Sequence, residues 1–152
     1  MTALLTFLLG AMSVSFLCSL LESTLLSSPL SYLITKEESG DRYAARLKRY
    51  KEDPSRPLAA ILSFNTIANT IGAAGVGRQA TILFGSEWFG LVSAITTILI
   101  LLFSEILPKT IGTGSWRSLT GFCAVSIRML IIVLYPIVVT VEFTETYLFE
   151  EQ

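Results

Sequence analysis

The sequence predicts an all-α membrane protein with three membrane-spanning helices. Of its 152 residues, 52% are hydrophobic and 15% are charged, and the mean hydropathy of +0.65 is outside the usual range of a soluble domain. Residues 1–21 and 57–77 carry no charge, and residues 88–108 carry only Glu105. Because about 20 apolar residues cross a bilayer as a helix, each of these runs is long enough to span it.

The first spanning helix is expected over residues 2–28. Pro29 should stop it, because proline cannot donate a backbone hydrogen bond. No basic segment precedes the apolar run, so we expect it to be retained rather than cleaved as a signal peptide. Serines recur every four residues on one face of this helix, at Ser15, Ser19, Ser23 and Ser27.

This serine face has two interpretations. Small residues at such a spacing are typical of close packing between membrane helices, with hydroxyl groups bonding across the contact. Alternatively, the lower part of the face lines an oxygen-rich cavity together with Glu22. In that case the break at Pro29 would free the backbone carbonyl of Leu25 as a further ligand.

Residues 30–56 form a charged loop between the first two spans. The loop holds seven of the eleven basic residues, so the positive-inside rule places it in the cytoplasm and the N-terminus outside. Residues 40–53 have the pattern of a short amphipathic helix with Tyr43, Leu47 and Tyr50 on one face. The net charge of −1, without a basic-aromatic pattern, gives no indication of nucleic-acid binding.

The second span, residues 57–84, carries two amide side chains one helical turn apart. Asn65 and Asn69 therefore face the same way. Amides in a membrane helix usually hydrogen-bond to neighbouring helices, and the alternative is that at least one of them binds a ligand. The glycines that follow, Gly72, Gly75 and Gly77, should let another helix approach closely.

The third span, residues 88–112, carries the acid Glu105. Pro108 follows three residues later and is expected to break or kink the helix, and Gly112 ends the motif. A charge inside a membrane segment costs about 2.5–3.5 kcal/mol and usually marks an ion or substrate path. The alternative places Glu105 at the lipid–water boundary, paired with Lys109 four residues on.

Residues 119–149 are ambiguous. The longest uncharged run there, Met129 to Val141, has only 13 residues and is interrupted by Pro136, which is short for a span. We expect a kinked helix along the cytoplasmic face of the bundle. Counting from Leu119 gives a run long enough for a fourth crossing, and that alternative stays open.

Oxygen donors thus come from three separate helices: a serine face with Glu22, an asparagine pair, and Glu105 with backbone carbonyls near Pro108. Oxygen-only ligation favours Mg²⁺, Ca²⁺ or Na⁺ over zinc or copper. The chain has no histidine, which excludes histidine acid–base chemistry. Cys18 and Cys123 lie in apolar segments and are expected to be packing residues rather than a disulfide.

The same residues resemble three motifs of the cyclin M/CorC magnesium transporters. The motifs are Cys18-Ser-Leu-Leu-Glu-Ser-Thr-Leu-Leu-Ser27, Asn65-Thr-Ile-Ala-Asn69 and Ser104-Glu-Ile-Leu-Pro-Lys-Thr-Ile-Gly112. The resemblance covers nearly the whole chain, and the third motif is the most specific. It implies a homodimer in the plasma (inner) membrane, with three spans per protomer, a cytoplasmic helical hairpin and a juxtamembrane belt helix. It also implies that paired CBS domains follow residue 152, since none lies within this chain.

The resemblance further implies that Mg²⁺ is held in the membrane by Ser, Asn and Glu side chains, with transport driven by exchange for Na⁺. By position, Ser19, Asn65 and Glu105 are the first candidates as ligands. The second group of candidates is Ser23, Ser27, Asn69 and Gly112. Three further positions are expected to matter without being ligands of first choice: Glu22, Pro108 and Lys109.

The sequence therefore predicts the membrane domain of a Mg²⁺ transporter, with Na⁺-coupled export. The alternative is a Mg²⁺-sensing membrane anchor that regulates another transporter without moving ions itself. An enzyme is not expected. An intramembrane hydrolase needs a serine beside a base, and the serines here follow a packing face, with Lys109 the only lysine near a membrane segment.

Overall fold

The computed structural model describes residues 1–149, and within them the chain is helical with no strand, which confirms the all-α class. Three helical segments of the described chain are long and apolar enough to cross a membrane: Thr2–Ser27, Ser55–Phe84 and Ser86–Val133. The elements, in chain order, are α1 (Thr2–Ser27), α2 (Leu30–Glu38), α3 (Arg42–Glu52), α4 (Ser55–Phe84), η1 (Ser86–Trp88), α5 (Phe89–Leu99), η2 (Ile100–Ile106), α6 (Leu107–Val133) and α7 (Tyr135–Phe149).

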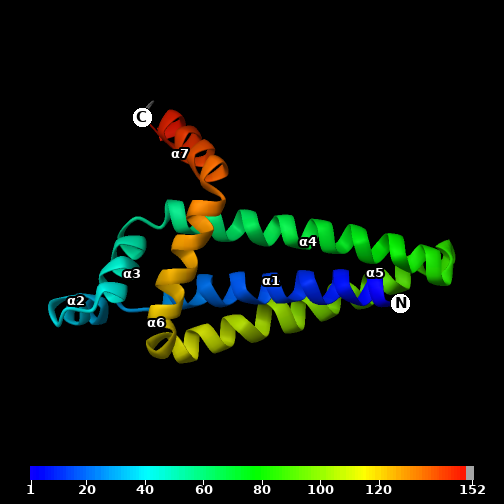
Figure 1. Cartoon of the computed structure of the whole chain (residues 1–152), viewed down its shortest axis with the longest axis horizontal. Helices are drawn as coiled ribbons and strands as arrows, with labels where there is room; N and C mark the ends of the chain where they lie inside the picture. Colours follow the sequence, from blue (N-terminus) through cyan, green and yellow to red (C-terminus); the bar gives the residue numbers. More distant parts are fainter. Residues whose placement is uncertain (150–152) are drawn as a thin grey trace.

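Helix α1 is the central element of the bundle. It lies between α4 on one side and the α5–η2–α6 segment on the other (Figure 1). Figure 1 also shows that α1 runs antiparallel to α4 and roughly parallel to the third span, with α2 and α3 at the end where α1 stops and α4 starts. Side chains of α1 can therefore meet both neighbouring spans.

The contact between α1 and α4 depends on a glycine. A Cβ atom at Gly72 would lie 2.2 Å from the Cβ of Ala11, so the two backbones approach as closely as glycine permits. Gly72 thus has the packing role that the sequence suggested for the glycines of the second span.

The end of α1 is capped by a lysine from the hairpin. Ser28 and Pro29 adopt extended backbone angles, so α1 ends at Ser27. The Lys51 ammonium, from α3, donates hydrogen bonds to the carbonyls of Leu25, at 3.2 Å, and Leu26. The Leu25 carbonyl is therefore not left free by the break at Pro29, because it accepts from this ammonium group.

The hairpin between the first two spans consists of α2 and α3. The Asp41 carboxylate caps α3 by accepting from the backbone N–H groups of Tyr43, at 2.9 Å, and Ala44, at 3.1 Å. Leu47 is buried, as its amphipathic pattern indicated, but Tyr43 is 51% exposed and Ala44 is buried in its place. The expected buried face is therefore rotated, because the small Ala44 is the side chain that fits against the bundle.

The third span does not break at Pro108. Residues Ile100–Ile106 are π-helical, and the N–H of Leu107 bonds to the carbonyl of Leu102, five residues earlier. In this π-helical segment each hydrogen bond reaches one residue further back than in an α-helix. The helix can therefore continue past Pro108, which has no N–H to donate, with helical backbone angles. The departure from helical geometry comes instead at Ser115, with φ −118° and ψ 19°. The expected break is thus displaced by seven residues toward the C-terminus.

After Ser115, α6 turns across the end of α1 and the start of α4 (Figure 1). Its inner face packs into the main core of the described chain, made by α6 with α1, α3 and α4. The members from α6 are Cys123, Ala124, Ile127 and Leu130, and those they meet include Cys18, Leu21, Leu25, Leu47 and Ile61. Cys18 and Cys123 are both fully buried and unpaired, which confirms their packing role.

Residues 119–149 form the end of α6 and a separate helix, α7. The chain leaves the helical conformation at Leu134, two residues before Pro136. Helix α7 then packs on the start of α4, where Arg56 forms an ion pair with Glu142 and the Ser55 hydroxyl donates to Glu145 at 3.1 Å. Among residues 1–149, no separate fourth spanning helix begins at Leu119.

Candidate cation site

Ser23 and Gly112 meet at a close contact between α1 and α6. A Cβ at Gly112 would lie 2.0 Å from Ser23 Oγ and 3.0 Å from the Leu20 carbonyl oxygen. Ser23 Oγ is itself within hydrogen-bonding distance of the carbonyls of Ser19, at 2.9 Å, Leu20, at 3.1 Å, and Pro108, at 3.5 Å. Ser23 and Gly112 therefore lie at a close contact between helices, as the first interpretation of the serine face expects.

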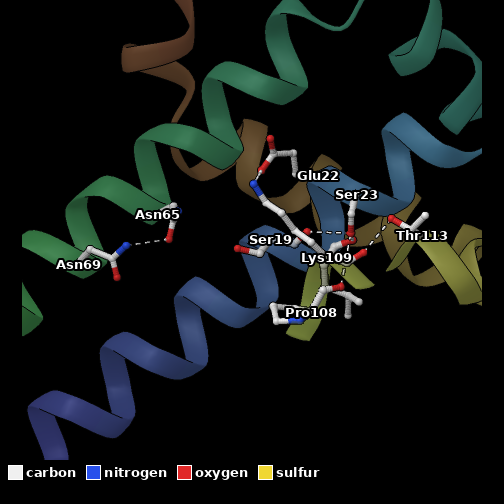
Figure 2. Close-up of polar contacts among 9 residues, drawn as sticks. Ser19, Glu22, Ser23, Asn65, Asn69, Pro108, Lys109 and Thr113 are labelled. Atoms are coloured by element: carbon white, nitrogen blue, oxygen red, sulfur yellow. Dashed lines mark hydrogen bonds and ion pairs between the residues drawn. The ribbon is translucent and has the colours of Figure 1, made fainter. Parts of the chain in front are cut away.

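Ser27, the last member of the face, also contacts α6. Its hydroxyl donates to Thr113 Oγ1 at 3.4 Å. Figure 2 shows Thr113 among the polar residues of this region. Thr113 was not singled out from the sequence. The only signal for it is that it directly follows Gly112, the residue that brings α6 against α1.

Glu22 and Lys109 form an ion pair between α1 and α6. The Lys109 Nζ lies 3.5 Å from a Glu22 carboxylate oxygen, and the two side chains are 50% and 23% exposed (Figure 2). The alternative in which Lys109 pairs with Glu105 is therefore wrong, although the spacing of four residues would permit it. The packing of α6 on α1 presents Lys109 to Glu22 instead.

Glu105 lies in the π-helical segment and is half-buried. Within residues 1–149 its carboxylate forms no ion pair and no hydrogen bond. The preceding residue, Ser104, is fully buried, and its hydroxyl has no hydrogen-bond partner in the described chain. π-Helical turns are frequent at functional sites, and here one carries the only acid of the third span that lies away from its ends.

The asparagine pair of α4 is the third group of oxygen donors. The Asn69 amide donates through Nδ2 to Asn65 Oδ1 at 3.3 Å. Asn69 Oδ1 is buried and has no partner among residues 1–149. Figure 2 shows both amides on the side of α4 that faces α1, with the hydroxyl of Ser19 directed toward them.

Ser19 is 2% exposed and lies one turn before Ser23 on the same face of α1. Ser19, the asparagine pair and Glu105 therefore come from three elements, each of which is α1 or packs on it. Residues 1–149 contain no group of three or more Cys, Asp or Glu side chains that could hold a metal. Hydroxyl, amide and carbonyl oxygens with one carboxylate make a donor set suited to a hard ion.

Three buried hydroxyls of the described chain have no hydrogen-bond partner, those of Ser15, Thr24 and Ser104, and the first and last of them have little signal in the sequence. Ser15 Oγ and Ser104 Oγ are both fully buried without a hydrogen-bond partner in the described chain. Ser15 could be found only as the upper end of the serine face, and Ser104 only as the neighbour of Glu105.

These features define a multi-pass membrane domain with a polar seam between its helices. The family model described as "Cyclin M transmembrane N-terminal domain" matches residues 4–150, nearly the whole chain. The chain belongs to this family of transmembrane domains, which is not a class of enzymes, and the resemblance drawn from the three motifs is confirmed.

Several proteins from bacteria are similar to the chain. It is 32% identical over 128 residues to the UPF0053 protein sll1254 of Synechocystis, covering 84% of this chain and 37% of that protein. It is 28% identical over 117 residues to a UPF0053 protein of Haemophilus influenzae, covering 77% of this chain and 28% of that one. It is also 28% identical over 75 residues to the UPF0053 inner membrane protein YfjD of Escherichia coli, covering 49% of this chain and 18% of that protein. The chain thus spans well under half the length of these relatives.

Proposed function

We propose that this chain is the membrane domain of a Mg²⁺ transporter that exports Mg²⁺ in exchange for Na⁺. The observation that carries the proposal is Glu105, an acid within a spanning segment that has no partner among residues 1–149. An unpaired charge at such a place costs about 2.5–3.5 kcal/mol, and a bound cation would offset that cost. Membership of the cyclin M family supports the choice of Mg²⁺.

Glu105 is the better ligand of the two acids in this region. Glu22 already has the Lys109 ammonium at 3.5 Å, so its charge is compensated by the protein. An ion that bound Glu22 would first have to displace Lys109. Glu105 has no such competitor in the described chain, and it is the acid that a divalent ion would stabilise most.

The remaining oxygen ligands of first choice are Ser19 from α1 and Asn65 from α4. Asn69 Oδ1 supports the set, because a buried amide oxygen without a partner can accept a cation at no cost in lost hydrogen bonds. The other second-group positions hold α6 on α1: Ser23 and Gly112 through direct contact, and Ser27 through Thr113. Pro108 supports them by pointing its carbonyl at Ser23.

Transport requires the site to open alternately to each side of the membrane. We assign this movement to the third span. There, the π-helical segment and the irregular angles at Ser115 lie on either side of residues 108–112, which contact α1. The Glu22–Lys109 pair would hold α1 and α6 together on the hairpin side. Na⁺, also a hard cation, could use the same oxygen donors for the return step.

The proposed setting is a homodimer in the plasma membrane, with the N-terminus outside and the α2–α3 hairpin in the cytoplasm. Seven of the eleven basic residues lie in and around the hairpin, which supports this orientation. The outer faces of α4 and α5 carry many exposed apolar side chains that lipid or a second copy would cover, among them Ile71, Ile82, Phe89, Leu91 and Ile95.

Flux into liposomes tests the proposal. The purified chain is reconstituted with a Mg²⁺-sensitive dye inside, and Glu105→Gln is compared with Glu87→Gln, which removes an exposed acid at the far end of the same span. We expect flux from the parent and from Glu87→Gln, and none from Glu105→Gln. A parent that binds Mg²⁺ but carries no flux would favour the sensing anchor, and equal flux from both variants would contradict the role of Glu105.

A further inference from the structure

An open groove lies between the start of α3 and the second half of α6. Its volume is about 870 Å³. Polar residues from the α3 side and the charged side chain of Arg128 form one part of its lining, and apolar residues of α6 form the other. The lining includes Arg42, Arg46, Arg128, Val125, Met129 and Ile132.

The three arginines of the groove are not neutralised by the protein. Within residues 1–149 none of their guanidinium groups forms an ion pair. The one acid in the lining, Asp41, already accepts from two backbone N–H groups as the cap of α3. The groove therefore presents a surplus of positive charge.

Two of these arginines, Arg46 of α3 and Arg128 of α6, line the groove from opposite elements. Burial raises the pKa of the nearby Tyr50, while the positive charges of the same two arginines act to lower it.

The apolar wall of the groove is exposed. Met129 and Ile132 are each 62% exposed and Val125 is 39% exposed, all on a helix that continues a spanning segment. Arginines beside exposed aliphatic side chains are the arrangement expected where a protein meets the phosphate level of a bilayer, with the aliphatic part toward the acyl chains.

We propose that this groove binds the headgroup of an anionic phospholipid, with the phosphate among Arg42, Arg46 and Arg128 and the acyl chains along the α6 wall. The charge of the groove fits an anion, and the exposed aliphatic wall fits the chains that only a lipid would bring. A free phosphate would use the arginines but would leave this wall in water. The site is separate from the Glu105 region and does not depend on the transport proposal.

Binding of lipid to the whole chain in neutral detergent, followed by native mass spectrometry, tests the inference. Phosphatidylglycerol and phosphatidylcholine with identical acyl chains are compared, and inorganic phosphate is used as a competitor. Each basic residue near an anionic bilayer surface strengthens binding by an amount equivalent to about fivefold in affinity. We therefore expect Arg128→Gln to weaken phosphatidylglycerol binding about fivefold. Arg42→Gln/Arg46→Gln should weaken it about 25-fold.

The matched control removes two basic residues of the same hairpin that lie outside the groove, as Lys36→Gln/Arg49→Gln. It should change the affinity less than twofold. Met129→Glu adds a negative charge at an exposed position and should also weaken phosphatidylglycerol binding about fivefold, which keeps the test valid if an arginine variant does not fold. Phosphatidylcholine should bind at least tenfold more weakly than phosphatidylglycerol.

Three results would overturn the inference. Equal loss in the control pair would mean that the hairpin attracts anions only through its total charge. Displacement of the lipid by inorganic phosphate at equal concentration would mean a site for free anions. If the Arg128→Gln variant and the Met129→Glu variant both keep the phosphatidylglycerol affinity of the parent, the lipid lies elsewhere.

Discussion

The contact between Gly112 and Ser23 gives the sharpest prediction on stability. Replacing Gly112 with Ala would place a Cβ 2.0 Å from Ser23 Oγ and 3.0 Å from the Leu20 carbonyl oxygen. The serine hydroxyl could rotate away, but the Leu20 carbonyl belongs to the backbone of α1, so α6 must also move. Overpacking of this kind typically costs about 1–3 kcal/mol, and we expect Gly112→Ala to lower the free energy of unfolding by that amount.

Gly114 provides the matched control, because a Cβ there would meet nothing within 4 Å. Gly114→Ala should leave the free energy of unfolding unchanged or raise it by about 0.5–1 kcal/mol, since alanine is the better helix former. The assay is denaturant unfolding in mixed micelles, followed by circular dichroism.

A double variant separates the steric effect from a general effect on α6. Ser23→Ala removes the hydroxyl at 2.0 Å and leaves its Cβ at 3.1 Å, so Ser23→Ala/Gly112→Ala should recover part of the lost stability. If Gly112→Ala is as stable as Gly114→Ala, or if the effects of the two substitutions simply add, the close contact between α1 and α6 is refuted.

Three further predictions concern polar contacts. Lys51→Met should lower the free energy of unfolding by about 1–3 kcal/mol, because it leaves carbonyls at the end of α1 without a donor, whereas Arg49→Met, at an exposed position, should not. Glu22→Lys should lower the free energy of unfolding, and the charge-swapped Glu22→Lys/Lys109→Glu should restore it in the same unfolding assay. A double variant no more stable than the single one would argue against the ion pair. Asn69→Leu should weaken Mg²⁺ binding in calorimetry about tenfold. Its buried oxygen has no partner to lose and the substitution breaks only the 3.3 Å hydrogen bond to Asn65, so the free energy of unfolding should fall by no more than about 0.5–1.5 kcal/mol; unchanged Mg²⁺ affinity would remove Asn69 from the site.

The class of fold was accessible from the sequence because its signals are local. Uncharged runs of membrane length identify the spans, and Pro29 ends the first helix without reference to any other part of the chain. The three motifs, in order along the chain and with a basic loop after the first, also sufficed to identify the family, because each motif consists of adjacent residues.

The sequence does not determine which ion-pair and hydrogen-bond partners meet when the helices pack together. Lys109 has an acid four residues before it and another on α1, and only the position of α6 decides that it pairs with Glu22. The carbonyl freed by Pro29 could equally have met an ion, and the fold of the hairpin brings Lys51 to it. The effect of Pro108 likewise depends on a π-helical turn, for which no local signal exists.

If oxygens from α1, α4 and the π-helical segment surround one cation, anomalous diffraction from crystals of the chain grown with Mn²⁺ should locate it. We expect a peak bounded by Ser19, Asn65 and Glu105, with oxygens at the distance of about 2.0–2.1 Å typical of the Mg²⁺ that Mn²⁺ replaces, or slightly longer. The same crystals of Glu105→Gln should show no peak. Mn²⁺ bound only elsewhere, with the Glu105 carboxylate turned away from Ser19 and Asn65, would rule out a shared cation site.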